Sequence, residues 1–498
     1  MKIRRSGILL HITSLPSPHG IGDLGSGAFR FADFLAETKQ GLWQILPLNP
    51  TDSTYFDSPY SAMSVFAGNP LLISPEYMAG EELLSEADIG SPPPFPKGQV
   101  DYRMVRTYKD RLFHRAYERF GMKAERNKYE QFCSDNSCWL ENFSMFMALK
   151  ARYPGKSWNK WPPEIRDRQP ATLRTVYKQL YKDIEKEKFL QYIFFQQWFS
   201  LREYCHRKSI QIIGDVPIYV AYDSADVWAN PEIFKLDEKK EPSFVSGVPP
   251  DLCSKTGQLW GNPVYRWDVL KERGYDWWIR RLEHSFKQYD LVRIDHFRGF
   301  IAYWEVPAGE KTAINGQWVA VPTEDFFRTL FKKFPSPPLI AEDLGKITPD
   351  VIQIMHRYDI PGMRPLLFAF GETLPGHNCA PHNIPQNSVV YTGTHDLNTI
   401  KGWFEKEATP EDRKRLFSYL GRKVPLAQLH RELIRLAMMT VANTVIIPMQ
   451  DILGLGEEAR MNRPGTAYGN WKWRLLPGQI TPSIARRLLE VTELYGRA

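Results

Sequence analysis

Cysteine, long apolar runs and blocks of like charge are scarce in this chain of 498 residues, and each absence excludes a class of protein. The five cysteines are odd in number and include no CxxC pair, so their spacing fits neither a zinc site nor a disulfide framework. Reduced thiols are typical of the cytosol. We therefore expect a cytoplasmic protein and no metal site.

The sequence also lacks segments that would carry it into or across a membrane. The apolar run Ile8–Leu10 is too short for a signal peptide. The most apolar long stretch, Leu433–Met449, is interrupted by Arg435 and Pro448, which excludes a transmembrane span. The net charge of +7 is spread thinly along the chain, so we expect neither nucleic acid nor a membrane as a partner.

Aromatic residues, in contrast, are plentiful. The chain contains 15 Trp, 23 Tyr and 28 Phe, which together make up 13% of its residues. Such a content indicates large buried cores, or flat apolar surfaces for a ligand with a polar rim such as a sugar. The composition alone favours the first interpretation. At 43% hydrophobic residues the chain is globular, and its length allows several domains or one large barrel with insertions.

Short β-rich runs that end in turn-forming or polar residues predict eight strands, separated by segments of helical periodicity. They are Gly7–Ile12, Leu42–Leu48, Ile210–Val216, Asp290–Asp295, Leu339–Asp343, Gly362–Phe370, Ser388–Thr394 and Thr444–Gln450. Near-continuous apolar strands alternating with helices favour a parallel sheet covered on both faces. Eight such units predict an α/β fold of the (β/α)8 barrel (TIM barrel) type. A doubly wound open sheet is the alternative.

Uneven spacing between these strands predicts insertions in the barrel. The second and third strands are much further apart than one crossover needs, which predicts a helical subdomain over about 75–190. A segment rich in Pro, Gly and Trp over about 222–270 predicts an irregular subdomain or lid, and about 371–387 predicts a loop. We expect residues 1–498 to form a single catalytic barrel without a separate C-terminal β-sandwich.

Acidic residues follow the predicted strands. Asp215, Asp295, Glu342 and Asp396 stand at such ends, where barrel enzymes place their catalytic groups. Any one of these acids could instead cap the next helix. Several converging carboxylates suit either divalent metal binding or glycoside cleavage.

A nearby cation helps to decide between these chemistries. Arg293 lies two residues before Asp295, so the two side chains share one face of a strand. A cation there favours the ionised form of Asp295, as a nucleophile requires, and disfavours a metal site.

Sequence blocks along the whole chain then identify a family. They are HITSLPSPHGIGDLG (11–25), SPYS (58–61), FAGNPLL (66–72), GDVPIYV (214–220), GVPPD (247–251), GQLWGNPVYRW (257–267), VRIDHFRGF (292–300), AEDLG (341–345), YTGTHD (391–396), EARMNRPG (458–465) and GNWKWRL (469–475). In this order they resemble the amylomaltases, which are the 4-α-glucanotransferases of glycoside hydrolase family 77 in the α-amylase superfamily.

This resemblance implies roles for individual residues. Asp295 matches the nucleophile, Glu342 the general acid/base, and Asp396 the carboxylate that holds sugar hydroxyls and stabilises the transition state. The other residues expected to bind substrate are Arg293, His395, His296, Asp215, Tyr60, Trp260, Asp57, Ser58 and Tyr55.

The resemblance also implies the reaction. The expected mechanism is a retaining double displacement through a covalent glucosyl-enzyme, with no cofactor. The expected substrates are maltooligosaccharides and glucans derived from starch or glycogen, and glucose is an acceptor. The residues alone do not separate this transferase from an α-1,4-glucan hydrolase, because the two differ only in whether a sugar or water attacks the intermediate. A non-catalytic glucan-binding protein is a further alternative, which the intact acidic trio disfavours.

The sequence departs from the family pattern at two sites. Leu252 and Cys253 stand where an aromatic pair is usual, and Leu397 stands where Asn is usual. The first departure predicts weaker stacking on long glucans, and it leaves Trp260 to provide much of the apolar contact on the acceptor side.

Overall fold

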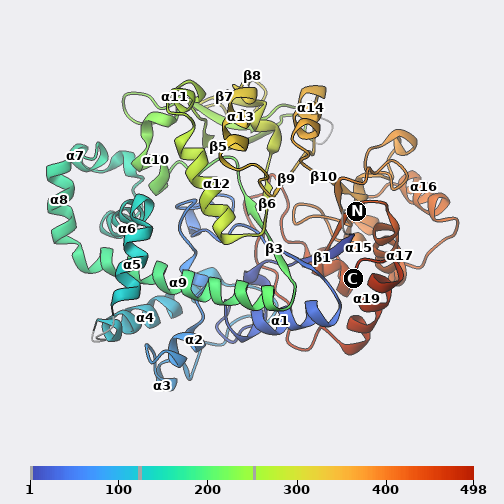
Figure 1. Cartoon of the computed structure of the whole chain (residues 1–498), viewed down its shortest axis with the longest axis horizontal. Helices are drawn as coiled ribbons and strands as arrows, with labels where there is room; N and C mark the ends of the chain where they lie inside the picture. Colours follow the sequence, from blue (N-terminus) through green and yellow to red (C-terminus); the bar gives the residue numbers. More distant parts are fainter. Residues whose placement is uncertain (1–3, 122–125, 251–253) are drawn as a thin grey trace.

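A closed barrel of eight parallel strands forms the centre of the computed structural model, which describes residues 4–121, 126–250 and 254–498 (Figure 1). The strands are β1 (Arg5–Leu9), β2 (Leu42–Gln44), β3 (Gln211–Val216), β6 (Leu291–Ile294), β9 (Leu339–Ala341), β10 (Gly362–Pro365), β11 (Ser388–Tyr391) and β12 (Thr444–Pro448). Around the barrel they follow the order β1-β12-β11-β10-β9-β6-β3-β2.

The first and last of these strands close the barrel. Strand β1 pairs in parallel with β12, from Arg5 opposite Thr444 to Leu9 opposite Pro448, and with β2 on its other side. This closure confirms the (β/α)8 prediction and excludes the open doubly wound sheet.

Each predicted strand overlaps one strand of the barrel, but the barrel strands are shorter than the β-rich runs. Strand β1 also begins at Arg5, two residues before the predicted run Gly7–Ile12. The run Leu42–Leu48 is paired as β2 only to Gln44. Ile45 still donates to the carbonyl of Ile213 at 3.0 Å, but the amide of Leu46 instead faces Nδ1 of His11 at 3.3 Å. Pro47 then has no backbone N–H to offer. The chain therefore leaves the ladder before its apolar run ends.

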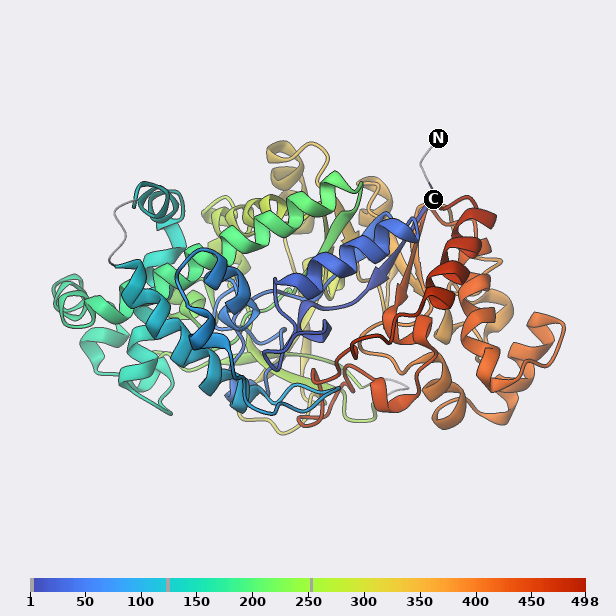
Figure 2. The same ribbon diagram turned by 90° about the horizontal axis from the view of Figure 1, so that it is seen from below.

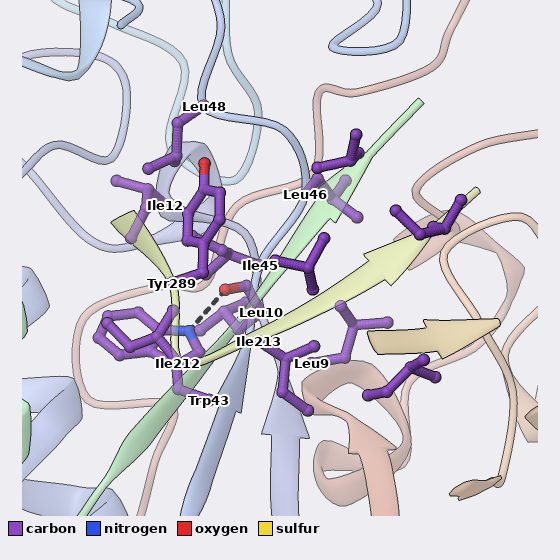
Figure 3. Close-up of a cluster of buried hydrophobic side chains, with 14 of the residues drawn as sticks. Leu9, Leu10, Ile12, Trp43, Ile45, Leu46, Leu48, Ile212, Ile213 and Tyr289 are labelled. Atoms are coloured by element: carbon purple, nitrogen blue, oxygen red, sulfur yellow. Dashed lines mark hydrogen bonds between the residues drawn. The ribbon is translucent and has the colours of Figure 1, made fainter. Parts of the chain in front are cut away.

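Apolar side chains from neighbouring strands fill the barrel and its surroundings (Figure 3). Trp43 is fully buried, and its indole Nε1 donates to the carbonyl of Leu10 at 2.8 Å. A Cβ atom on Gly214 would lie 2.2 Å from the ring of Tyr289. Glycine is required there because the tyrosine ring packs directly on strand β3, next to Asp215.

Helices account for most of the long connection between β2 and β3 (Figures 1 and 2). They are α2 (Pro75–Gly80), α3 (Glu86–Ile89), α4 (Tyr102–Phe120), α5 (Asn127–Asp135), α6 (Ser137–Arg152), α7 (Pro163–Arg166), α8 (Pro170–Gln179) and α9 (Tyr181–Arg207). Figure 2 shows most of these helices extending from one side of the barrel, with α9 running back toward β3. Helix α9 thus belongs both to this helical region and to the layer that covers the barrel.

The remaining helices cover the barrel and its loops. They are α1 (Ser26–Glu37), α10 (Ala225–Ala229), α11 (Trp267–Glu272), α12 (Asp276–Gln288), α13 (Thr323–Lys333), α14 (Pro349–Arg357), α15 (Ile400–Lys406), α16 (Pro410–Leu420), α17 (Leu426–Met439), α18 (Met449–Leu453) and α19 (Pro482–Leu494). Short 3₁₀ turns are η1 (Ile12–Ser14), η2 (Ser53–Tyr55), η3 (Pro70–Leu72), η4 (Trp158–Lys160), η5 (Pro231–Ile233), η6 (Phe297–Phe300), η7 (Leu366–Phe368), η8 (Leu374–Gly376) and η9 (Glu457–Ala459). Within the described ranges, no helix is long and apolar enough to cross a membrane.

A second sheet of four antiparallel strands stands beside the barrel, in the order β5-β4-β7-β8. Its strands are β4 (Phe244–Val248), β5 (Gln258–Pro263), β7 (Ala302–Pro307) and β8 (Gln317–Ala320). Strands β4 and β5 lie in the segment expected to form a lid, whereas β7 and β8 follow β6 and were not expected. The sheet joins these two loop regions because β4 pairs with β7.

Candidate active site

The four acids expected at strand ends come from four strands of the barrel, of which β3, β6 and β9 are neighbours and β11 is separated from β9 by β10. Asp215 lies in β3, Asp295 follows β6, Glu342 follows β9 and Asp396 lies in the loop after β11. The ladder continues past the strand ends, because Asp295 donates its N–H to Val216 and Glu342 donates its N–H to Ile294, both at 3.0 Å. These bonds fix the positions from which two of the carboxylates project.

Arg293 binds two of the acids, Asp215 and Asp295. Its Nη1 atom donates to both carboxylate oxygens of Asp215 at 2.7 Å, and its Nη2 atom lies 3.0 Å from Oδ1 of Asp295. The side chains of Arg293 and Asp215 are 3% and 0% exposed, whereas that of Asp295 is 26% exposed. Burial opposes the charge on Arg293, but the two acids raise its pKa well above the ordinary value. The buried ion pair of Arg293 and Asp215 therefore supports the partly exposed carboxylate of Asp295.

Asp295 and Glu342 both have raised pKa values, and the pKa of Glu342 is the higher of the two. Desolvation is the main cause for each. Arg293 limits the rise at Asp295, whereas the negative charge of Asp295 adds to the rise at Glu342. Between the two values Asp295 is ionised while Glu342 holds a proton, as an acid and a nucleophile require.

Backbone N–H groups hold the carboxylate of Glu342 in place. The amide of His296 donates to Oε2 at 2.7 Å, and the amide of Leu344 donates to Oε1 at 2.9 Å. The backbone of His296 is left-handed, with φ of 49°. These two bonds favour the ionised form of Glu342, so the side chain is prepared to act as a base once it has lost its proton.

Asp396 lies in the opposite electrostatic setting. Burial would raise its pKa, but His395, Asn462 and Arg293 outweigh burial and keep the pKa well below the ordinary value. Nε2 of His395 lies 3.2 Å from Oδ2, and Nδ2 of Asn462 donates to Oδ1 at 2.6 Å. Its side chain is 37% exposed. Asp396 is therefore an ionised, partly exposed hydrogen-bond acceptor.

Tyr60 connects these groups. Its hydroxyl donates to Oδ2 of Asp215 at 2.8 Å and lies 2.6 Å from Nε2 of His395. The rings of Tyr60 and His395 stack with centroids 5.3 Å apart and planes 10° apart. Burial and the neighbouring acids raise the pKa of Tyr60 well above its ordinary value, so its hydroxyl keeps its proton.

Trp260 of β5 brings the second sheet to the site. Its indole meets the ring of His296 edge-on, with centroids 4.8 Å apart and planes 90° apart, and 38% of the residue is exposed. Burial, together with Arg298, lowers the pKa of His296 to about 4, so this imidazole is neutral at neutral pH. Leu252 and Cys253, the unusual pair of this loop, lie outside the described residues.

The other three candidates contact helix α4, their own loop and the segment after β3. Asp57 pairs with Arg106 of α4, and Oγ of Ser58 accepts from the amide of Tyr60 at 3.3 Å. The hydroxyl of Tyr55 accepts from the amide of Asp223 at 3.2 Å. These contacts shape the loop that leads to Tyr60.

Two further acids at strand ends have structural partners. Asp343 accepts from the amide of Met363 at 2.7 Å and from Arg364 at 2.8 Å. Asp451 accepts from Thr392 at 2.7 Å and from the amide of Ile400, the first residue of α15, at 2.8 Å. Asp451 therefore binds the start of α15, an earlier helix whose N-cap is Thr399, and strand-end position alone does not identify a catalytic acid.

Sequence reasoning missed two residues that hold Asp396. They are Asn462, described above, and Arg460, whose Nη2 donates to the carbonyl of Asp396 at 3.0 Å. Both lie in the block EARMNRPG, which supported the family resemblance but received no role. A hollow of about 440 Å³ is lined by side chains that include His395 and Arg460. In the part of the chain that the structure describes, no cluster of three His, Cys, Asp or Glu residues could hold a metal ion.

Comparisons with known proteins agree on one family. The family model described as 4-alpha-glucanotransferase matches residues 10–479. A 4-alpha-glucanotransferase of Aquifex aeolicus is 49% identical over 95% of this chain and 96% of its own length. One from Synechocystis is 47% identical over 99% of this chain and 98% of its own. Among solved structures, an amylomaltase from Streptococcus agalactiae in complex with acarbose matches with a TM-score of 0.96 and 38% identity, covering 99% of this chain and 100% of that one.

Proposed function

The chain belongs to the 4-alpha-glucanotransferase family, glycoside hydrolase family 77, and we propose that Asp295, Glu342 and Asp396 perform its reaction. The enzyme transfers an α-1,4-glucan segment from one maltooligosaccharide to the 4-hydroxyl of another glucan, with retention at the anomeric carbon. The observation that carries the residue assignment is electrostatic. Glu342 and Asp396 have pKa values shifted in opposite directions, and Asp295 is paired with a buried cation.

In the first step, Glu342 gives its proton to the glycosidic oxygen while a carboxylate oxygen of Asp295 bonds to the anomeric carbon. The bond to the leaving glucan breaks, and that glucan departs with the proton on its 4-oxygen. Arg293 stays with Asp215 and keeps Asp295 ionised until it reacts. Asp396, ionised and partly exposed, accepts hydrogen bonds from sugar hydroxyls as positive charge develops on the ring.

Formation of the glucosyl ester changes the environment of Glu342. Asp295 no longer carries a negative charge, so one cause of the raised pKa of Glu342 disappears. The amides of His296 and Leu344 stabilise the resulting carboxylate. Glu342 then removes a proton from the 4-hydroxyl of the acceptor, which attacks the anomeric carbon and releases Asp295.

The substrate-binding roles follow from contact with these groups. Tyr60, His395 and Asp215 form one hydrogen-bonded group beside the reacting sugar, in which the buried Asp215 acts through Tyr60 and Arg293. Trp260 with His296 lies on the acceptor side. Asp57, Ser58 and Tyr55 act further out, by shaping the loop before Tyr60. We assign free glucose as the smallest acceptor and the cytoplasm as the location of the enzyme.

The barrel and its insertions contribute to this one site. The barrel carries the acids, the helical insertion of about 75–190 supports the loop before Tyr60 through Arg106, and the segment of about 222–270 supplies Trp260. The loop of about 371–387 precedes β11, from which His395 and Asp396 follow.

Incubation with maltotriose tests the proposal. A ladder of longer and shorter glucans is expected, and the appearance of label from added glucose in the ladder would establish glucose as an acceptor. Mostly glucose and maltose would indicate a hydrolase instead, and unchanged maltotriose would indicate a binding protein. Asp295→Asn, Glu342→Gln and Asp396→Asn are each expected to abolish the ladder while leaving the fold intact.

A further inference from the structure

Trp471 has a backbone conformation that bulky residues rarely adopt. Its φ of 63° lies in the left-handed region, where Cβ approaches the following carbonyl oxygen. The residue is only 6% exposed. Its N–H donates to the carbonyl of Met461 at 2.8 Å, and its own carbonyl accepts from the hydroxyl of Tyr102 at 2.8 Å. Tertiary contacts on both sides therefore impose the strained conformation.

The indole that this conformation places is in contact with the proposed sugar-binding side chains. The ring of Trp471 packs on Tyr60 with centroids 5.7 Å apart, and on His395 with centroids 6.3 Å apart. Tyr60 and His395 in turn stack on each other. Three aromatic rings thus form one unit whose polar atoms reach Asp215 and Asp396.

The segment that leads to Trp471 also holds the backbone of this unit. The amide of Asn462 donates to the carbonyl of His395 at 3.0 Å, and the side chain of Asn462 donates to Asp396. Arg460 donates to the carbonyl of Asp396. The loop after β11 is therefore fixed by residues that follow β12, and Trp471 extends this support to Tyr60.

We propose that Trp471 is a positioning residue for the reaction, and that it locks Tyr60 and His395 in the geometry that the transition state requires. The proposal rests on the roles assigned to Tyr60, His395 and Asp396 above. Side chains that bind a reacting group act only within a narrow range of positions, so their rotamers must be fixed by packing. The indole of Trp471 packs on the rings of Tyr60 and His395, so we expect it to act through these two partners.

Kinetics of Trp471→Ala with maltotriose test the proposal. We expect kcat to fall about 10–100-fold, as displacements near 1 Å do, with KM changed less than kcat. Trp471→Phe keeps an aromatic ring and is expected to recover most of the loss. Trp473→Ala is the matched control, because Trp473 lies two residues away and is 9% exposed. It is expected to lower the melting midpoint and to leave the kcat of the folded enzyme within about twofold.

A second variant separates positioning from stability. Trp471→Gly also removes the ring, but glycine adopts a positive φ without strain, so this variant is expected to be more stable than Trp471→Ala. The proposal requires both variants to be equally slow. It is overturned if activity instead follows stability across the series, or if Trp473→Ala loses as much kcat as Trp471→Ala.

A double-mutant cycle tests the route of action. In a Tyr60→Ala background, Trp471→Ala is expected to cost much less than it does in the wild type, because the two residues act as a unit. Equal losses in both backgrounds would overturn the proposal. Asp396→Asn separates the two levels of inference. If that variant is inactive while Trp471→Ala keeps full activity, only the positioning role fails, whereas a fully active Asp396→Asn would overturn the site itself.

Discussion

Nη2 of Arg293 lies 3.0 Å from Oδ1 of Asp295, while Nη1 of the same guanidinium is bound to both oxygens of the fully buried Asp215. One cation thus binds two carboxylates, of which that of Asp215 is buried and that of Asp295 is partly exposed. Arg293 therefore influences both the ionisation of the nucleophile, Asp295, and the stability of the buried part of the site.

Arg293→Gln is expected to affect both properties. Loss of the cation removes the main influence that lowers the pKa of Asp295, so the acid limb of the kcat/KM profile moves to higher pH. Asp215 is left buried without its cation and keeps only the hydroxyl of Tyr60 of the partners described above, which costs about 3–5 kcal/mol of unfolding free energy. Urea unfolding and pH–rate profiles measure the two effects. Arg293→Lys keeps the charge and is the control, and an unmoved acid limb in Arg293→Gln would contradict the assignment of Asp295.

Asp295→Asn is expected to lower kcat by several orders of magnitude, because the amide cannot form the glucosyl intermediate. The measurement is consumption of maltotriose by protein whose circular dichroism and melting midpoint match the wild type. Retention of more than a few per cent of the activity would show that another group is the nucleophile.

The pH dependence of kcat/KM is expected to be bell-shaped. Activity needs ionised Asp295 and protonated Glu342, so it rises with pH through the pKa of the first and falls through the pKa of the second. Both pKa values are raised, so both limbs lie above the ordinary range for carboxyl groups. A substrate whose leaving group departs without a proton allows the Glu342→Gln variant to be assayed. The pH profile of this variant is expected to lack the alkaline limb. Persistence of that limb would assign it to another residue.

Trp260→Ala is expected to shift the products from transfer toward free glucose. Trp260 is 38% exposed beside His296, and stacking a sugar on its indole is worth on the order of 1 kcal/mol beyond burial, by analogy with aromatic pairs. Its loss weakens the acceptor more than it slows donor cleavage. The test is glucose released against maltotriose consumed, with Tyr181→Ala as a control at an aromatic residue that is 50% exposed on α9. An unchanged ratio would make Trp260 a packing residue.

Lys109→Ala is expected to destabilise the fold by about 3–5 kcal/mol. Lys109 is fully buried, its ammonium donates to the carbonyls of Leu71 and Ile73 at 2.7 Å, and it lies 3.8 Å from buried Asp23. Lys39→Ala is the control, since Lys39 is 51% exposed and its pair with Glu493 is worth about 0–1 kcal/mol. Chemical denaturation measures the loss of unfolding free energy in both variants. Equal losses would refute the stabilising role of buried Lys109.

Local patterns in the sequence were enough to predict the barrel, because each parallel strand is a short apolar run buried on both faces. They did not predict the second sheet. Strand β7 pairs with β8 and also with β4, and the pairing with β4, which places Phe244 opposite Pro307, joins two segments that no local turn connects. Long-range antiparallel pairing between short strands leaves little trace in periodicity.

The candidate site, like the fold, was only partly predictable from the sequence. The motifs pointed to Asp295, Glu342 and Asp396, but the groups that tune them are distant in sequence or belong to the backbone. The amides of His296 and Leu344 have no side-chain signature, and Asn462 reaches Asp396 from a different loop. Asp451 shows the converse, since its position resembles that of a catalytic acid and only its hydrogen-bond partners, Thr392 and the amide of Ile400, reveal a structural role.

Closure of the barrel by β1 and β12 has a consequence for protein synthesis. Residues 5–9 leave the ribosome long before residues 444–448, and at about 5–20 residues per second the delay is on the order of 20–90 s. Throughout that interval one edge of β1 presents backbone donors and acceptors with no strand beside it, and such edges pair with other chains. A ribosome that stalls shortly before residue 444 would prolong this exposure. We therefore expect the yield of native enzyme to depend on translation speed near the end of the message and on chaperones that cover the open edge.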